Sequence, residues 1–157
     1  EIACENRERI RVVFAMDCCG REVVSPVATT GGITSEIIKD LMTEAIEYHF
    51  SLITALPHRI EWLSDNGSAY TSRATVSLHS RRDYPVHHTP YHSPESNGMA
   101  ESFVKTFKGE YVSTHILPDA RTVMELLSSW FEDYNEYHPH KGLKMKSPRE
   151  YRRQALR

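Results

Sequence analysis

The sequence predicts a single mixed α/β domain. Three strand-like segments open the chain, short strand and helix patterns alternate through its middle, and amphipathic helical patterns fill its second half. The length of 157 residues suits one domain, and 39% hydrophobic with 25% charged residues allows both a buried core and a charged surface.

The N-terminal third is predicted to be an antiparallel meander. Residues 1–4 are expected to end one strand, and the polar residues 5–8 to form a turn. The β-branched and apolar segments 9–17 and 21–28 are the second and third strands. Pro26 places the third strand near an edge of the sheet or ends it early, because proline lacks the N–H that a central strand needs.

The middle of the chain predicts a strand–helix–strand unit behind a first helix. Apolar residues recur at helical spacing over 35–50. Residues 58–65 and 83–90 are expected strands, with a weaker helical pattern over 71–82 between them. Such a unit implies parallel pairing of its two strands through a right-handed crossover.

Two further helices complete the predicted architecture after a loop at 91–98. One is expected over 99–111 and the other over 119–138, and each has an apolar stripe. The simplest interpretation of both stripes is core packing. His138 and His140 flank a proline in the next segment, and without partner ligands we interpret them as packing or surface histidines.

Composition favours a cytoplasmic protein. The odd cysteine count, with Cys18 and Cys19 adjacent, gives no disulfide framework. The sequence has no Cys-x-x-Cys spacing, so a zinc site is not expected. The N-terminus resembles no signal peptide, and no apolar run approaches the roughly 20 residues of a membrane span, so we expect no membrane partner. The chain opens without Met inside an expected strand, which predicts a segment of a longer protein.

The net charge of −2 hides an uneven distribution. Residues 141–157 have a net charge of +6, whereas residues 1–140 have a net charge of −8. We therefore divide the chain into a core, 1–140, and a basic extension, 141–157. The extension suits either contact with phosphates or a solvated terminal helix, and both interpretations stay open.

Asp65 ends an expected buried strand within the stretch EWLSDNGSAY. Asp-Asn-Gly is ordinary turn chemistry, because these residues tolerate left-handed backbone and bond their own main chain. The alternative is a carboxylate fixed at a sheet edge to bind a metal. On local grounds the turn interpretation is favoured.

Glu101 follows Asp65 with 35 residues between them, a span that holds one helix, one strand and one loop. Both carboxylates can therefore lie at the same end of the sheet, as two-metal phosphoryl transfer requires. Lys105 and Lys108 share the helix face of Glu101 and suit a phosphate backbone. The alternative is an exposed Glu–Lys helix pair.

The segments SDNGSAY and SPESNGMAESFVKTFK, at this spacing, resemble the catalytic core of insertion-sequence transposases and retroviral integrases. The segment YNEYHPHKGLKMKSPREY is similar to the closing part of the same core in bacterial insertion-sequence transposases. The resemblance covers essentially the whole chain. It implies a ribonuclease H-like fold and an Asp-Asp-Glu recombinase. With this resemblance, metal binding becomes the favoured interpretation of Asp65 and Glu101, in place of a turn residue and a helix ion pair.

The resemblance also assigns roles to residues. It implies that Asp65 and Glu101 are catalytic acids that bind Mg²⁺ or Mn²⁺. It implies DNA contacts by residues of the turn, the following loop and the catalytic helix: Asn66, Ser93, Glu95, Ser96, Asn97, Lys105 and Lys108. Expected partners are transposon-end and target DNA, bound by a homo-oligomer that is nucleoid-associated when on DNA.

One acid of the expected triad is missing from the sequence. The resemblance places the first catalytic Asp just before Glu1. Asp17 ends the second strand and is not expected to be that metal ligand, and Glu1 and Glu5 are no better substitutes. Two hypotheses therefore remain: a transposase core that performs DNA 3′-end cleavage and strand transfer, and a truncated, inactive remnant that binds DNA or dimerises. A ribonuclease H-like nuclease with another substrate is disfavoured by the segment SPESNGMAES.

Overall fold

A computed structural model describes residues 1–50, 60, 62–64, 86–88 and 98–155. Its first sheet has the order β1-β2-β3 and is antiparallel throughout, as predicted. The strands are β1 (Ile2–Ala3), β2 (Arg9–Met16) and β3 (Val23–Thr29). The turn between β2 and β3 begins one residue earlier than expected and ends later.

Among the described strands β3 lies at the edge of its sheet, which is the first of the two alternatives expected from Pro26. The strand does not end early, since it continues past Pro26 to Thr29. The register shifts between Val13 and Ala15 of β2, opposite Ser25 and Pro26, and Ser25 has a φ of 48°. A bulge thus absorbs the proline without ending the pairing.

Two short strands, β4 (Trp62–Ser64) and β5 (Val86–His88), pair in parallel, as the strand–helix–strand pattern predicted. Within the described residues they form a separate two-stranded sheet. The helix expected over 71–82 lies outside the described residues.

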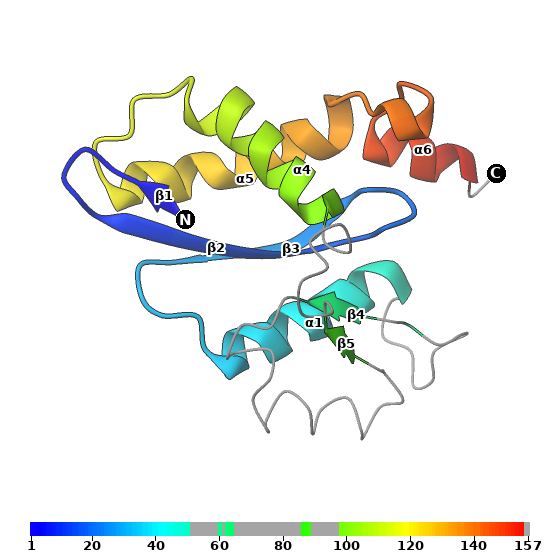
Figure 1. Ribbon diagram of the computed structural model, residues 1–157, viewed down its shortest axis with the longest axis horizontal. Helices are drawn as coiled ribbons and strands as arrows, with labels where there is room; N and C mark the ends of the chain where they lie inside the picture. Colours follow the sequence, from blue (N-terminus) through cyan, green and yellow to red (C-terminus); the bar gives the residue numbers. More distant parts are fainter. Residues whose placement is uncertain (51–59, 61, 65–85, 89–97, 156–157) are drawn as a thin grey trace.

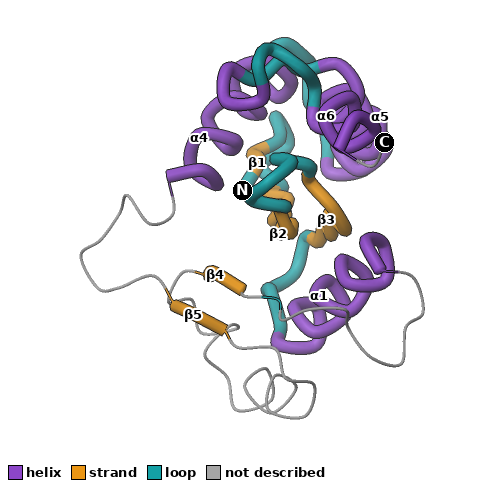
Figure 2. Tube along the Cα trace, turned by 90° about the vertical axis from the view of Figure 1, so that its right-hand side faces the viewer, coloured by secondary structure: helices purple, strands orange, loops and turns teal. Residues whose placement is uncertain are grey.

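Helices cover both faces of the three-stranded sheet (Figure 1). α1 (Ser35–Phe50) lies on one face and has the predicted bounds. α4 (Gly98–Phe107), α5 (Ala120–Tyr137) and α6 (Pro148–Ala155) lie on the other face, as the turned view in Figure 2 also shows. The helix expected over 99–111 changes at Lys108 into a π-helical turn, Lys108–Val112.

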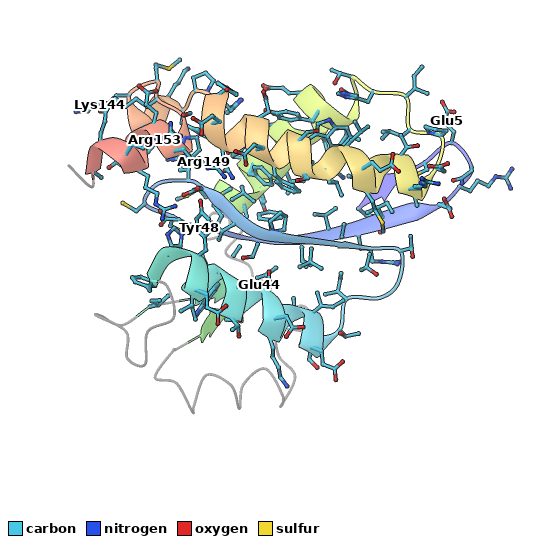
Figure 3. The ribbon with its side chains drawn as sticks, turned by 180° about the vertical axis from the view of Figure 1, so that it is seen from behind. Glu5, Glu44, Tyr48, Lys144, Arg149 and Arg153 are labelled. Carbon is cyan, nitrogen blue, oxygen red and sulfur yellow. The ribbon has the colours of Figure 1, made fainter. Side chains whose placement is uncertain are left out.

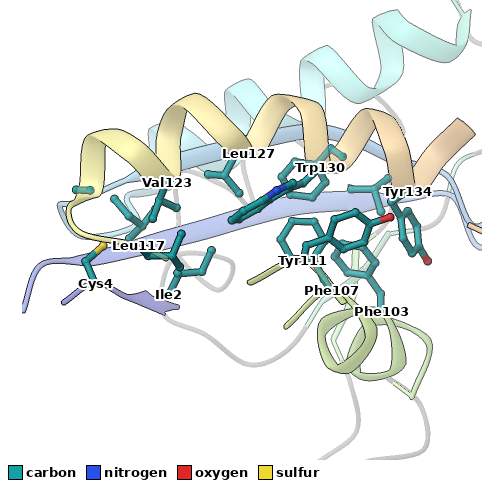
Figure 4. Close-up of a cluster of buried hydrophobic side chains, with 14 residues drawn as sticks. Ile2, Cys4, Phe103, Phe107, Tyr111, Leu117, Val123, Leu127, Trp130 and Tyr134 are labelled. Atoms are coloured by element: carbon teal, nitrogen blue, oxygen red, sulfur yellow. The ribbon is translucent and has the colours of Figure 1, made fainter. Parts of the chain in front are cut away.

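The alternation of β2 divides the core into two clusters. Ile10 and Phe14 face α4 and α5, where aromatic rings dominate the larger cluster shown in Figure 4. Val13 and Ala15 face the opposite way, toward the apolar side of α1. The apolar stripes of the predicted helices are thus core, as expected.

Candidate active site and nucleic-acid interface

α4 holds Glu101 by burying the opposite side of the helix. Phe103 is buried and its ring centroid lies 4.7 Å from that of Phe14 on β2 and 4.8 Å from that of Tyr134 on α5. Phe107 stacks on Phe131 at 4.8 Å. These contacts fix the rotation of α4 about its axis, so the first-turn Glu101 is exposed.

The exposed side of α4 and of the π-helical turn that continues it carries three charges. Glu101, Lys105 and Lys108 are all exposed, and no described residue forms a hydrogen bond or ion pair with any of their side chains. The Glu–Lys pair that was the simpler interpretation is therefore not formed within the described residues. No described residue occupies the two ammonium groups or the carboxylate.

The other predicted site residues lie outside the described residues. These are Asp65, which directly follows β4, and Asn66, Ser93, Glu95, Ser96 and Asn97, the last directly preceding α4. Their roles stay predictions. Within the described residues, no group of three or more His, Cys, Asp or Glu side chains is placed to hold a metal ion.

The donor chemistry of the predicted pair suits a hard cation. Glu101 offers carboxylate oxygens that no described donor occupies, at the N-terminal end of its helix. A set of carboxylates without cysteine or histidine is the set that Mg²⁺ and Mn²⁺ prefer. The side-chain chemistry of Asp65 and Glu101 is therefore suited to Mg²⁺ or Mn²⁺.

Asp17 has a structural task in the turn that joins β2 to β3. Its carboxylate accepts hydrogen bonds from the backbone N–H groups of Cys19 at 3.0 Å and Gly20 at 2.8 Å. Its own N–H donates to the carbonyl of Glu22. This use as a turn residue agrees with the prediction that it is not the first metal ligand.

Three arginines of the basic extension pair with carboxylates of other elements. Arg149 and Arg152 both donate to Glu22, at 3.1 and 3.0 Å, and Glu22 is only 1% exposed. Arg149 also pairs with Glu132, and Arg153 forms two bonds with Glu136. Figure 3 shows Arg149 and Arg153 on α6, at the same end of the molecule as Tyr48. These charges hold α6 in place and are already matched by carboxylates.

Sequence reasoning missed the centre of this cluster. Glu22 directly precedes β3, a mostly apolar strand, and its carboxylate accepts a hydrogen bond from the hydroxyl of Tyr48 at 2.7 Å. Next to it, Asn135 bridges the main chain of Val23, accepting from its N–H at 2.9 Å and donating to its carbonyl at 2.8 Å. The only sequence signal was a charged and an amide residue inside two otherwise apolar patterns.

The histidines of the His-Pro-His segment pack, as predicted. His138 stacks on Tyr134 with ring centroids 5.0 Å apart and lies 3.1 Å from Glu110. His140 meets the same tyrosine edge-on. Burial first, and then the nearby His138 and Arg21, lower the pKa of His140 to about 4, so its ring is neutral at neutral pH.

Comparison with known proteins agrees with this arrangement. Residues 82–148 match the family model described as an integrase core domain. An insertion element IS136 protein of Agrobacterium fabrum is 47% identical over 152 residues, which cover 96% of this chain and 77% of that protein. The putative transposase InsD for insertion element IS2E of Escherichia coli is 47% identical, with 98% of this chain and 70% of that protein covered.

A longer InsD transposase of Escherichia coli is also 47% identical, and this chain spans 51% of its length. Among solved structures, the catalytic core domain of BIV integrase matches with a TM-score of 0.67 and 18% identity, covering 99% of this chain and 92% of that one. The catalytic domain of Mos1 transposase matches with a TM-score of 0.61 and 17% identity, covering 83% and 66%. These structural likenesses establish the ribonuclease H-like fold.

No helix within the described ranges is long and apolar enough to cross a membrane. With an integrase-type core fold and relatives at 47% identity along nearly its full length, the chain belongs to the insertion-sequence transposases of the integrase type.

Proposed function

We propose that this chain is the catalytic core for DNA 3′-end cleavage and strand transfer during transposition. The observation that supports this most directly is the exposed face of α4 and of the π-helical turn that continues it, whose charged side chains have no partner among the described residues. It presents Glu101 beside Lys105 and Lys108 on a helix that aromatic packing fixes in place.

The reaction consists of two phosphodiester exchanges. Water first cleaves a P–O bond at the element end and frees a 3′-hydroxyl group. That hydroxyl then attacks a target phosphodiester, forming one new P–O bond and breaking one, so no covalent protein–DNA intermediate is needed. Asp65 and Glu101 would hold Mg²⁺ or Mn²⁺, which when bound supplies Lewis-acid stabilisation of the charge that develops at phosphorus.

The lysines have a separate task in this proposal. Lys105 and Lys108 hold phosphates of the DNA backbone by charge, since neither ammonium group has a described carboxylate partner. Such contacts set the position of the duplex without reading its sequence. A homo-oligomer assembled on paired DNA ends, and nucleoid association of the bound protein, belong to the same proposal.

The test is a Mg²⁺-dependent nicking and strand-transfer assay with element-end DNA, using the chain together with whatever residues precede Glu1 in its reading frame. Glu101→Gln should lower the rate by on the order of 10³-fold or more, because a lost ligand removes several kcal/mol of charge stabilisation. Glu125→Gln is the matched control, since Glu125 is exposed on α5 and pairs only with Arg121 among described residues. An unchanged rate in Glu101→Gln would refute the assignment. DNA binding without any turnover in the parent chain would favour the inactive remnant instead.

A further inference from the structure

A second group of cations lies away from α4, at the end of the molecule where α6 begins. Lys141 and Lys144 belong to the loop between α5 and α6, and Arg21 belongs to the β2–β3 turn, so two distant parts of the sequence contribute. Arg21 lies against the loop: a Cβ added to Gly142 would be 2.7 Å from its Nη2 atom and 3.1 Å from its Cζ atom. We call Arg21, Lys141 and Lys144 the end patch.

The end patch differs from the neighbouring arginines of α6 in its pairing. No described residue offers a carboxylate to the side chain of Arg21, Lys141 or Lys144 within ion-pair distance. Arg149 and Arg153, by contrast, are matched by glutamates. Among the described residues of the basic extension, the positive charge without a carboxylate partner is therefore concentrated at the loop, and Figure 3 shows Lys144 at the extremity of the molecule beside α6.

The loop that carries the lysines is tightly fixed. His140 and Lys146 form a β-bridge, and the carbonyl of His140 accepts hydrogen bonds from Leu143 at 3.0 Å and Met145 at 2.8 Å. Leu143 is 3% exposed and anchors the loop in the protein. The cations are thus presented on an ordered support and not on a solvated tail.

The loop also stores backbone strain. Lys144 and Met145 have φ values of 58° and 63°, in the left-handed region that non-glycine residues adopt only at an energetic cost. Arg21 has a φ of 57° on the other side of the patch. Residues held in this way cluster at ligand clamps, where the surrounding structure fixes a functional geometry.

We propose that the end patch binds the sugar–phosphate backbone of duplex DNA and gives the chain a second DNA contact. The inference rests on the proposed function, because it takes DNA as the substrate. Three cations without a carboxylate partner among the described residues, held on a rigid support, suit contact with phosphates, and the chain's net charge of −2 means that this attraction is local. Contacts of Lys and Arg with phosphates fix the position of a duplex without carrying sequence information, so the contact we propose is to the backbone and not to a particular base sequence.

The experiment measures binding of a short fluorescent duplex by anisotropy across a series of salt concentrations. The test variant is Lys141→Gln with Lys144→Asn, because asparagine tolerates the left-handed conformation at position 144. Losing two phosphate contacts should reduce the slope of log K against log salt by about 2. Adding Arg21→Gln should reduce it by about 1 more.

The control variant carries Lys39→Gln and Arg121→Gln, which changes the net charge equally at helix positions outside the patch. Its slope should equal that of the parent chain. Thermal melting of each variant checks that the loop substitutions leave the fold intact.

Three results would overturn the end patch. The first is a loop variant whose slope of log K against log salt equals that of the parent chain. In that case Lys105→Gln with Lys108→Gln tests the DNA contact of those two lysines by itself. The nicking assay of Glu101→Gln does not depend on the end patch. The second is a slope lost equally in the control variant. The third is competition by poly-glutamate as strong as that by unlabelled duplex, which would assign the patch to an acidic peptide. A parent chain that binds no duplex at low salt would refute DNA contact at both surfaces.

Discussion

At the scale of single residues, Glu22 is a buried carboxylate whose charge needs several partners. It is almost fully buried, and it accepts hydrogen bonds from Tyr48, Arg149 and Arg152. A buried carboxylate is tolerated only when its charge and lone pairs are matched, and removing one partner leaves the others uncompensated. One side chain thereby ties β3, α1 and α6 together.

Glu22→Gln should therefore lower the free energy of unfolding by about 2–3 kcal/mol, because it takes the carboxylate from the partly buried Arg152 and one of its carboxylates from Arg149. Urea denaturation measures the change. Glu132→Gln is the control: this carboxylate also pairs with Arg149 but is 60% exposed, so the expected loss is below about 1 kcal/mol. Equal losses in both variants would contradict the central position of Glu22.

His140 predicts how stability depends on pH. Its pKa is lowered from 6.5 to about 4 in the fold, so the unfolded chain binds a proton more readily. Its contribution to stability is complete above pH 6.5 and is lost as the pH falls toward 4. The buried Nε2 atom has no hydrogen-bond partner within the described residues, so phenylalanine can replace the ring.

His140→Phe should accordingly flatten the fall in unfolding free energy between pH 6.5 and 4, as measured by urea denaturation at several pH values. His115→Phe serves as the comparison, because that ring is exposed and also lies against an aromatic side chain, Trp130. A parental pH profile in His140→Phe would show that other groups cause the fall.

At the scale of elements, α6 is held largely by ion pairs to other elements. Its arginines bind glutamates of α5 and of the β2–β3 turn, while Pro148 is its buried residue. The helix has eight residues, which is too short to be stable by itself in water. Its order therefore depends on these contacts.

Replacing Arg149 and Arg152 together with alanine should open α6 locally and leave α5 closed. Hydrogen exchange measures this directly: amide protection should fall in 148–155 and persist in 120–137. Arg121→Ala, which breaks only an exposed pair within α5, should change neither segment. Loss of protection throughout the chain would mean that α6 is not a separate unit.

The elements also show what a sequence can and cannot predict. The apolar stripe of α5 and the alternating apolar residues of β2 could be predicted, because the period of apolar residues is a local property of the sequence. The π-helical turn at Lys108–Val112 was missed, since it depends on contacts from other elements, such as the bond of the Tyr111 hydroxyl to Asp133 at 2.7 Å. Glu22 was missed for the same reason: its partners lie 26 to 130 residues away.

The candidate site divides in the same way. Glu101 and its lysines could be placed on one exposed helix face from spacing alone, and the structure agrees. Asp65 and the loop residues from Ser93 to Asn97 stay predictions, because the chain there lies outside the described residues. The end patch could not be predicted, since its proximity of Arg21 to Gly142 joins segments 121 residues apart.

At the scale of the whole molecule, one sheet separates two apolar clusters. The larger is shared with α4 and α5, and the smaller with α1. Because β2 contributes alternate residues to both, neither cluster can be lost while the other keeps its full support. The domain should therefore unfold as one cooperative unit.

The two tryptophans of the chain allow a direct test. Trp130 lies in the larger cluster and Trp62 packs against the smaller one. Fluorescence of Trp62→Phe and of Trp130→Phe should each give a urea midpoint equal to that from circular dichroism of the same variant. Different midpoints for the two signals within either variant would show that the clusters unfold separately.

The edge of β3 has a consequence for how copies of the protein behave at high concentration. An exposed edge strand offers unpaired N–H and C=O groups to other chains and is a template for aggregation. Here the amide of Asn135 occupies the main chain of Val23, and the bulge at Ser25 and Pro26 interrupts the strand two residues later. The Asn135 side chain that docks α5 thus bonds part of this edge, and the bulge removes the straight edge that a further strand needs, so we expect neighbouring molecules not to join strand to strand here.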